Sequence, residues 1–310
     1  MTGGRARTVF IGSGGFGRES LWRLAEHPDI ELVGVVSAPP RAAGRGGRTT
    51  VTPIHEAARH LEVRPILTPE RLREPAAVAE ILALDPELVV LADYGQIVPS
   101  PLLGPPLGAL NLHPSLLPRY RGATPIPAAI LAGDTETGVT LMRMDAGLDT
   151  GPIVAQTRVP LQGDETTPLL EETLEVEAAE LLMRYLGPWV RGKITATTQP
   201  EDGASLTRPL RREDGRLDPR RPAVELERQV RAYQPWPGSF VETDAGRLVV
   251  WRSEATSRGP APGVFDQEGF GTADGGRLRL REVQPAGGNR MMWDAFLRGR
   301  PSIVGSSIVG

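Results

Sequence analysis

The sequence lacks cysteine and has a single lysine, Lys193, among its 310 residues. Without cysteine the chain can form no disulfide, no cysteine-ligated zinc site and no thiol nucleophile. Because every other basic residue is arginine, chemistry that needs a lysine at a given place is excluded almost everywhere. The histidines are too scattered to form a metal-spaced cluster, and we expect no bound metal: His27, His55, His60 and His113.

Long apolar runs are absent as well. No segment approaches the roughly 18 apolar residues that a membrane-spanning helix needs. The chain passes into a strand-like apolar segment almost at once, which leaves no room for a signal peptide. We therefore expect a cytoplasmic protein that makes no membrane contact. The composition, 40% hydrophobic and 24% charged, is typical of globular proteins, and the length is sufficient for two domains.

Strand-like and helix-like segments alternate through the first 198 residues. Short apolar segments at 8–12, 31–37, 87–92, 108–113 and 153–160 are typical of buried strands. An amphipathic helix is predicted over 169–185, where apolar residues recur at helical spacing. The alternation predicts an α/β fold with a doubly wound, mainly parallel, Rossmann-like sheet.

The composition changes near Thr198. Residues 199–222 are polar and rich in proline and arginine, as in a linker. Beyond them, a short helix at 224–232 and several short alternating segments separated by glycines predict a smaller, OB-like β-barrel. We therefore expect a catalytic domain at 1–198, a linker at 199–222 and a β-barrel domain at 223–310. Residues 208–310 carry 17 basic and 13 acidic side chains, against 18 and 25 in residues 1–207, which favours phosphate contacts in the C-terminal part.

A glycine-rich turn follows the first predicted strand. Its sequence, G-S-G-G-F-G at 12–17, matches the G-x-G-x-x-G pattern of dinucleotide-binding proteins. Such proteins place an acidic residue at the end of the second strand, but that strand ends V-V-S-A-P-P here. We therefore expect no nicotinamide cofactor, and interpret the glycines as a tight turn.

The chemistry is predicted to lie between residues 109 and 153. Asn111 and His113 share one face of a strand, because side chains alternate along it. Pro114 ends that strand, so His113 lies at its carboxyl end, where open α/β sheets bind ligands. Asp149 lies between two glycines, Gly147 and Gly151, that permit close backbone approach. Taken singly, these are ordinary strand-end, turn and loop residues. Together, an amide, an imidazole and a carboxylate suit acyl transfer.

Three phrases in this region resemble a known family. They are N-L-H-P-S-L-L-P-R-Y-R-G at 111–122, G-D-T-E-T-G-V-T at 133–140 and M-D-A-G-L-D-T-G-P-I at 144–153. They are similar to the methionyl-tRNA formyltransferase family, and the likeness extends along nearly the whole chain. The short core N-x-H…S-L-L-P…D is shared by other folate-dependent formyltransferases, whereas the longer phrases point to the tRNA-specific family.

The resemblance implies a folate-dependent transfer reaction. A formyl group would pass from the cosubstrate 10-formyltetrahydrofolate to the amino group of methionine on initiator methionyl-tRNA. Asn111 would hydrogen-bond the formyl oxygen, His113 would move a proton, and Asp149 would orient the imidazole or take a proton through water. The resemblance further implies that folate is bound by Ser115, Leu116, Leu117, Pro118, Tyr94 and Gly95.

The resemblance also implies contacts with tRNA. The family has a loop with A-G-R-G that enters the acceptor stem, and residues 39–53 form a basic Gly/Arg/Pro loop here. The expected tRNA-binding residues are Arg41, Arg45 and Arg48 in this loop and Arg208, Arg211 and Arg212 in the linker. Two residues depart from the family pattern: Gly14 within the usual G-T-P-x-F, and Asp93 before Tyr94, where a small apolar residue is more common.

Two alternatives remain open from the sequence. A formyltransferase for a small amine, such as glycinamide ribonucleotide or a nucleotide sugar, would share the core motif but would need neither the basic loop nor the C-terminal module. A non-catalytic RNA-binding protein would need no intact set of Asn111, His113 and Asp149. We expect a monomer.

Overall fold

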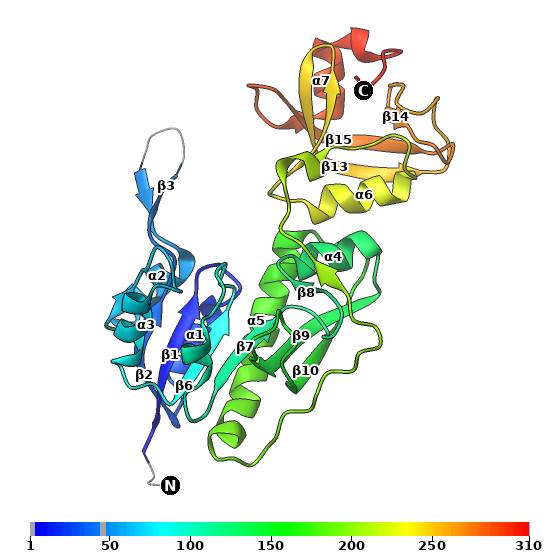
Figure 1. Ribbon diagram of the computed structural model, residues 1–310. Coiled ribbons are helices and arrows are strands. Elements are labelled where there is room, and N and C mark those ends of the chain that lie inside the picture. The colour runs from blue at the N-terminus through cyan, green and yellow to red at the C-terminus, as the bar shows by residue number, and fades with distance from the viewer. Residues whose placement is uncertain (1–3, 44–47, 310) are drawn as a thin grey trace. The chain divides into compact units, whose positions relative to one another are not determined.

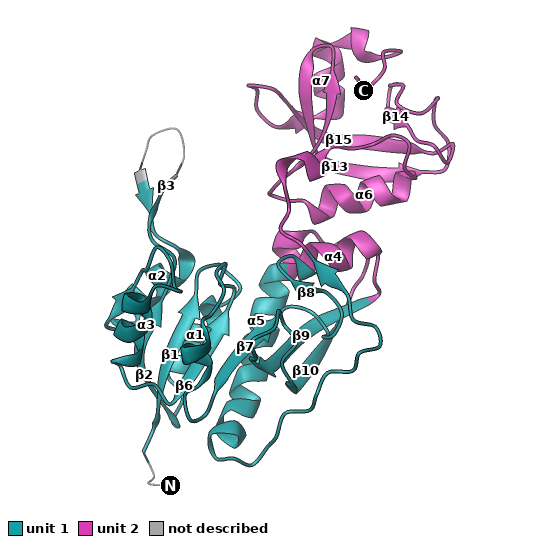
Figure 2. Ribbon diagram, viewed as in Figure 1, with its two compact units in different colours: residues 1–125, 136–160, 171–207 teal, residues 126–135, 161–170, 208–310 magenta. Residues whose placement is uncertain are grey.

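The computed structural model describes residues 4–43 and 48–309, and Figure 1 traces the chain. The chain divides into two compact units, coloured separately in Figure 2. Unit 1 contains residues 1–125, 136–160 and 171–207, and unit 2 contains residues 126–135, 161–170 and 208–310. Residues 199–207 of the expected linker thus group with unit 1. The domain boundaries drawn from composition stay a prediction.

A seven-stranded sheet, in the order β10-β9-β7-β6-β1-β2-β5, organises unit 1. Strands β5, β2, β1, β6 and β7 pair in parallel, whereas β9 runs antiparallel to both β7 and β10. The mainly parallel α/β sheet expected from the sequence is therefore confirmed. The strands are β1 (Ala6–Gly12), β2 (Ile30–Val36), β5 (Ile66–Leu67), β6 (Leu88–Ala92), β7 (Ala109–His113), β9 (Glu136–Arg143) and β10 (Ile153–Pro160).

Helices cover both faces of this sheet. Val9 and Ile11 of β1 pack in one buried cluster with Leu72 and with Val78 of α3 (Pro75–Leu82). Phe10, between them in the strand, turns to the opposite face, where α1 (Arg18–Ala25) and α2 (Pro53–His60) contact β2. The chain proceeds from β1 to β2 and β5, then returns to β6 on the other side of β1. The carboxyl ends of β1 and β6 therefore flank the point where the strand order reverses, and β7 is next to them.

The start of helix α2 and the buried face of helix α5 follow from their sequences. Helix α2 begins where Thr52 Oγ1 accepts a hydrogen bond from His55 N–H at 3.1 Å, with a proline at its first position. The amphipathic helix expected at 169–185 is confirmed as the longer α5 (Thr167–Val190), with Leu174, Leu181 and Leu186 buried. Unit 1 also contains the short helix η1 (Ser100–Leu103), and helix α4 (Pro125–Ala132) is the first helix of unit 2. Among the helices of the described residues, none is both long and apolar enough to cross a membrane.

The basic loop expected at 39–53 contains a short hairpin. Strands β3 (Arg41–Ala43) and β4 (Arg48–Thr50) pair antiparallel. The loop expected from the sequence therefore includes two paired strands, because glycine and arginine content gives no signal for strands of three residues. Arg45 lies outside the described residues.

Unit 2 contains an antiparallel half-barrel. Its strands follow the order β12-β13-β15-β14, and β16 pairs with β15. An aromatic cluster fills its core: the ring centroids of Phe265 and Phe270 lie 5.7 Å apart, and those of Trp293 and Phe296 lie 5.4 Å apart. The elements are η2 (Arg212–Gly215), α6 (Ala223–Ala232), β12 (Ser239–Thr243), β13 (Gly246–Thr256), β14 (Gly269–Gly271), β15 (Arg277–Pro285), β16 (Met291–Met292), α7 (Trp293–Gly299) and η3 (Pro301–Ile303).

The two departures from the family pattern, Gly14 and Asp93, lie against each other. The Asp93 carbonyl accepts hydrogen bonds from the backbone N–H groups of Ser13 (2.9 Å) and Gly14 (3.3 Å). A Cβ atom added at Gly14 would lie 1.5 Å from Asp93 Oδ2. Asp93 has a φ of 52°, a left-handed conformation that aspartate tolerates better than most residues. The Asp93 carboxylate thus occupies the space that a side chain at residue 14 would need.

Glu171 of α5 meets the same turn. Its side chain is half-buried and accepts a hydrogen bond from the backbone of Phe16. Burial, with the neighbouring carboxylates of Asp93 and Glu175, raises the pKa of Glu171. Ionised Glu171 therefore opposes folding above its folded-state pKa, and the opposition disappears as pH falls below the unfolded-state value.

Gly14→Ala should destabilise the protein by about 1–3 kcal/mol, because the added methyl group meets the Asp93 carboxylate. In an Asp93→Gly background, which suits the left-handed backbone, the same substitution should cost almost nothing. Urea unfolding of the two single variants and the double variant measures this coupling. Gly104→Ala is the control, because its added Cβ makes only ordinary contact, 3.6 Å from the Pro101 carbonyl. If Gly14→Ala lowers the free energy of unfolding by the same amount with and without the Asp93 side chain, the two residues do not interact and this interpretation is wrong.

Glu171→Gln should raise the thermal midpoint at pH 7.5 and leave it unchanged at pH 4. The neutral amide keeps an oxygen for Phe16 N–H and removes a carboxylate whose ionised form is disfavoured in the folded state. Thermal unfolding of the wild type and the variant across this pH range tests the sign. A variant that is less stable at pH 7.5 would show that the ionised carboxylate contributes favourably.

Candidate active site

Strand β7 presents two buried polar side chains at its carboxyl end. Asn111 is 5% exposed and His113 is 4% exposed, and their two-residue spacing puts them on one face of the strand. Within the described residues, Asn111 Oδ1 is buried without a hydrogen-bond partner. Buried polar atoms are usually paired, so this oxygen is available to a ligand.

The His113 ring lies between a backbone carbonyl and a carboxylate. Its Nε2 is 2.9 Å from the Tyr120 carbonyl oxygen, and its Nδ1 is 3.7 Å from Asp149 Oδ2. A carbonyl oxygen only accepts hydrogen bonds, so this contact assigns the proton of the neutral ring to Nε2. Nδ1 then has a free lone pair and can accept a proton beside the Asp149 carboxylate.

Asp149 is fixed by its own backbone and by a second loop. It adopts a φ of 53°, and its Oδ2 accepts a hydrogen bond from Gly122 N–H at 2.7 Å. Gly151 is needed for this close approach, because a Cβ there would lie 1.9 Å from the Arg143 carbonyl oxygen. The structure thus brings Asp149 to His113, and Asn111 lies on the same strand face as that histidine.

The turn at Ser115–Pro118 is held by two residues that sequence reasoning missed. Thr140 Oγ1 donates to the Ser115 carbonyl at 2.6 Å and accepts from Leu117 N–H at 3.1 Å. Gln156 Nε2 donates to Thr140 Oγ1 and to the Leu117 carbonyl, at 2.8 and 3.0 Å. A polar residue inside the apolar run V-T-L-M was the available signal for Thr140. Of the four residues expected to contact folate here, Ser115 and Leu117 are buried, and Leu116 and Pro118 are half-buried.

Tyr94 and Gly95, the other residues expected at the folate site, follow β6. Tyr94 packs against the buried cluster that contains Val9 and Ile11. Burial raises the pKa of its hydroxyl, which has no hydrogen-bond partner in the described residues. Gly95 has open space where a side chain would be. Just beyond them is a pocket of about 310 Å³ lined by Arg71, Arg73, Gln96 and Ile97.

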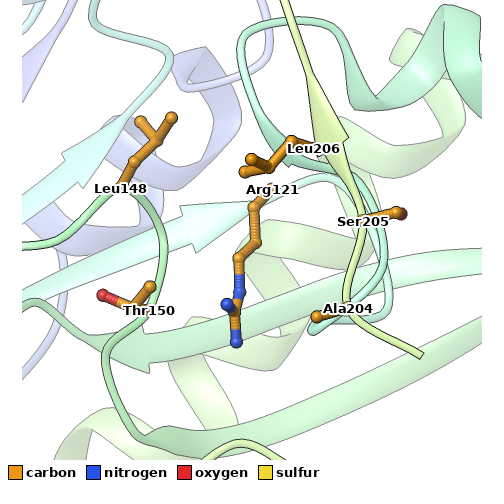
Figure 3. A pocket seen from close by; sticks show the side chains of 6 residues that line it. All are labelled: Arg121, Leu148, Thr150, Ala204, Ser205 and Leu206. Atoms are coloured by element: carbon orange, nitrogen blue, oxygen red, sulfur yellow. The ribbon is translucent and has the colours of Figure 1, made fainter. Parts of the chain in front are cut away.

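A second pocket borders the His113–Asp149 pair. It has a volume of about 500 Å³ and is lined by Arg121, Leu148, Thr150, Ala204, Ser205 and Leu206. Figure 3 shows the Arg121 side chain between Leu148 and Thr150 on one side and residues 204–206 on the other. Leu148 and Leu206 are 60% and 74% exposed, so the opening of this pocket is apolar.

The expected tRNA-binding arginines occupy two separate regions. Arg41 is exposed in β3 and Arg48 belongs to β4; Arg45 is not described. Arg211 and Arg212 are exposed at the start of η2. The remaining one, Arg208, is ion-paired: it donates two hydrogen bonds to Asp214, at 2.8 and 2.6 Å, and this guanidinium lowers the pKa of Asp214 to about 2. Among the described residues, no three His, Asp or Glu side chains gather as a metal site would require.

Several solved structures share this architecture. One is an N-formyltransferase from Helicobacter canadensis in complex with folinic acid and dTDP-3-aminofucose, with a TM-score of 0.64 and 16% identity, covering 89% of this chain and 98% of that one. Another is HypX from Aquifex aeolicus in complex with tetrahydrofolic acid, with a TM-score of 0.64 and 17% identity, covering 94% and 47%. At these identities the similarity establishes the fold alone.

Sequence similarity is more specific. The formyl transferase family matches residues 6–186, and the formyl transferase C-terminal domain matches residues 209–301. The methionyl-tRNA formyltransferase of Roseiflexus sp. (strain RS-1) is 45% identical over 289 residues, covering 91% of this chain and 88% of that protein. That of Myxococcus xanthus (strain DK1622) is 41% identical over 307 residues, covering 97% of both. With both family domains and relatives of this similarity along its length, the chain belongs to the methionyl-tRNA formyltransferase family.

Proposed function

We propose that the protein transfers a formyl group from 10-formyltetrahydrofolate to the amino group of methionine on initiator methionyl-tRNA, for translation initiation. The observation that carries the proposal is the contact of the buried His113 imidazole with Asp149, beside Asn111, in a chain 40–45% identical to methionyl-tRNA formyltransferases. One chain supplies all three groups, so a monomer suffices. The cytoplasmic location of the protein, where charged tRNA meets reduced folate, stays a prediction.

In the proposed reaction, the neutral methionine amine attacks the formyl carbon. The new C–N bond places negative charge on the formyl oxygen, which the Asn111 amide N–H stabilises, while Asn111 Oδ1 accepts a hydrogen bond from the amine. Nδ1 of His113 takes a proton from the attacking nitrogen, and Asp149 stabilises the resulting imidazolium. The bond from the formyl carbon to N10 of the folate then breaks, N10 receives the proton, and tetrahydrofolate leaves.

The folate donor is proposed to lie along the carboxyl ends of β6 and β7. The turn at Ser115–Pro118 offers backbone groups that Thr140 and Gln156 hold in place. The pocket beyond Gly95 contains two guanidinium groups, of Arg71 and Arg73, which suit the carboxylates of the folate glutamate. The presence of folinic acid or tetrahydrofolic acid in the solved structures of similar fold supports a folate cosubstrate.

The tRNA is proposed to bind through the basic hairpin loop and through residues 208–212. Arg41, Arg45 and Arg48 would contact phosphates from the first region, and Arg211 and Arg212 from the second. Arg208 would join them by exchanging its Asp214 partner for a phosphate. Guanidinium groups suit phosphate geometry as well as lysines do, so the scarcity of lysine does not oppose this role.

Transfer of labelled formyl from 10-formyltetrahydrofolate should occur to methionyl-tRNA, and not to uncharged tRNA, glycinamide ribonucleotide or a nucleotide-linked amino sugar. The apparent affinity for methionyl-tRNA should fall steeply between 50 and 200 mM salt, because phosphate contacts release counterions. Label on a small amine alone would overturn the tRNA substrate and keep the formyl-transfer chemistry. No transfer to any acceptor by folded protein would overturn the enzyme assignment.

His113→Ala should lower kcat by about 10²–10⁴-fold, as expected when a proton-transfer group is removed, while the affinity for folate stays unchanged. Single-turnover transfer and equilibrium titration with folinic acid measure the two quantities. The matched control is His60→Ala, which removes an exposed imidazole at the end of α2. Activity of His113→Ala within tenfold of the wild type would rule out the proton-transfer role.

A further inference from the structure

Gln199 is a buried amide in the segment between the two family matches. It is 5% exposed and lies between helix α5 and β11 (Leu206–Thr207), in residues 187–208 that neither family domain covers. Its side-chain Nε2 donates to the Asp149 carbonyl at 2.8 Å and to the Gly151 carbonyl at 2.7 Å. Its Oε1 accepts from Arg121 Nε and Nη2, at 3.0 and 2.8 Å.

We propose that Gln199 is a positioning residue for catalysis, which holds Asp149 at the distance from His113 that proton transfer needs. This inference rests on the proposed function. Gln199 joins two segments that both contact the catalytic pair. One is the loop at 149–151, and the other is the segment 120–122, from which Tyr120 contacts His113 and Gly122 contacts Asp149.

Two hydrogen bonds hold different parts of Asp149. Gly122 N–H holds the carboxylate, and Gln199 holds the backbone carbonyl. The residue between these contacts has a φ of 53°, and such left-handed conformations of non-glycine residues usually persist only where neighbouring contacts hold them. With the Gln199 contact removed, the backbone can relax and the carboxylate can turn about its hydrogen bond to Gly122.

An amide suits this place better than other side chains. It offers two N–H donors to the two carbonyl oxygens and one acceptor to the guanidinium of Arg121. Leucine, of similar size, would leave two buried carbonyls and an arginine without their partner. Glutamate would still pair with Arg121, but would direct a carboxylate oxygen at the carbonyls of Asp149 and Gly151.

The rest of the segment holds the partner loop. Ser205 Oγ accepts from Tyr120 N–H at 2.8 Å, and Thr207 Oγ1 donates to the Arg121 carbonyl at 3.0 Å. Strand β11 pairs in parallel with β8 (Arg121–Gly122). A Cβ at Gly122 would lie 2.3 Å from the Thr207 carbonyl oxygen, so this close pairing requires glycine at the position that donates to Asp149.

A positioning role predicts a specific kinetic pattern. Neither substrate is proposed to touch Gln199, so its loss should lower kcat and leave both KM values unchanged. Misplacement of a catalytic group by about 1 Å costs on the order of 100-fold, so we expect kcat of Gln199→Leu to fall about 10- to 100-fold. The kcat of Gln199→Glu should lie between those of the wild type and Gln199→Leu, since glutamate keeps only the contact with Arg121.

The decisive experiment is a double-mutant cycle with Asp149→Asn, in the full chain, with methionyl-tRNA and 10-formyltetrahydrofolate as substrates. If Gln199 acts through the Asp149 carboxylate, Gln199→Leu should change kcat by less than threefold in the Asp149→Asn background. Thermal unfolding of each variant gives its folded fraction, and kcat is calculated per folded molecule. Gln267→Leu, which removes an exposed amide in unit 2, is the matched control.

Three outcomes would overturn the proposal. Gln199→Leu could retain wild-type kcat, could lose activity only in proportion to unfolded protein, or could lower kcat by the same factor with and without the Asp149 carboxylate. In each case wild-type transfer to methionyl-tRNA remains, so the proposed function stands. Absence of transfer by the folded wild type is the separate result that overturns both.

Discussion

The hydrogen bond from Gly122 N–H to Asp149 Oδ2, 2.7 Å long, is the contact on which the site depends. It sets the carboxylate 3.7 Å from His113 Nδ1, and it exists only because residues 120–122 are brought to the end of β7. Strand pairing with β11 fixes those residues, and the approach of the Thr207 carbonyl excludes any side chain at position 122. The separation of these two side chains therefore follows from backbone packing.

Around this contact, neutral side chains do most of the positioning. Thr140, Gln156, Gln199 and Ser205 each bond backbone groups of the loops that bear site residues. Hydrogen bonds between neutral groups fix geometry without adding charge to the pocket. The dipoles of these backbone groups are therefore held in fixed orientations.

The two residues that depart from the family pattern contact each other. Gly14 and Asp93 are far apart in sequence, yet the Asp93 side chain fills the space that a Cβ at Gly14 would occupy. Glu171 adds a further carboxylate with a raised pKa to the same turn. The glycines of the turn at 12–17 also permit close packing, because a Cβ at Gly12 would lie 2.6 Å from the Ala92 carbonyl oxygen.

The sequence by itself determined the α/β class, the mainly parallel sheet, and the pairing of Asn111 and His113 on one strand face. Periodicity and strand alternation are local properties, and proline and glycine mark their ends. The tertiary structure alone decided which atoms meet Asp149, that Thr140 and Gln156 hold the turn at 115–118, and that residues 199–207, expected to be linker, belong to unit 1. Gly122 and Gln199 are 27 and 50 residues from Asp149, and their hydrogen bonds form only when separate loops converge at one sheet edge, which no local pattern encodes.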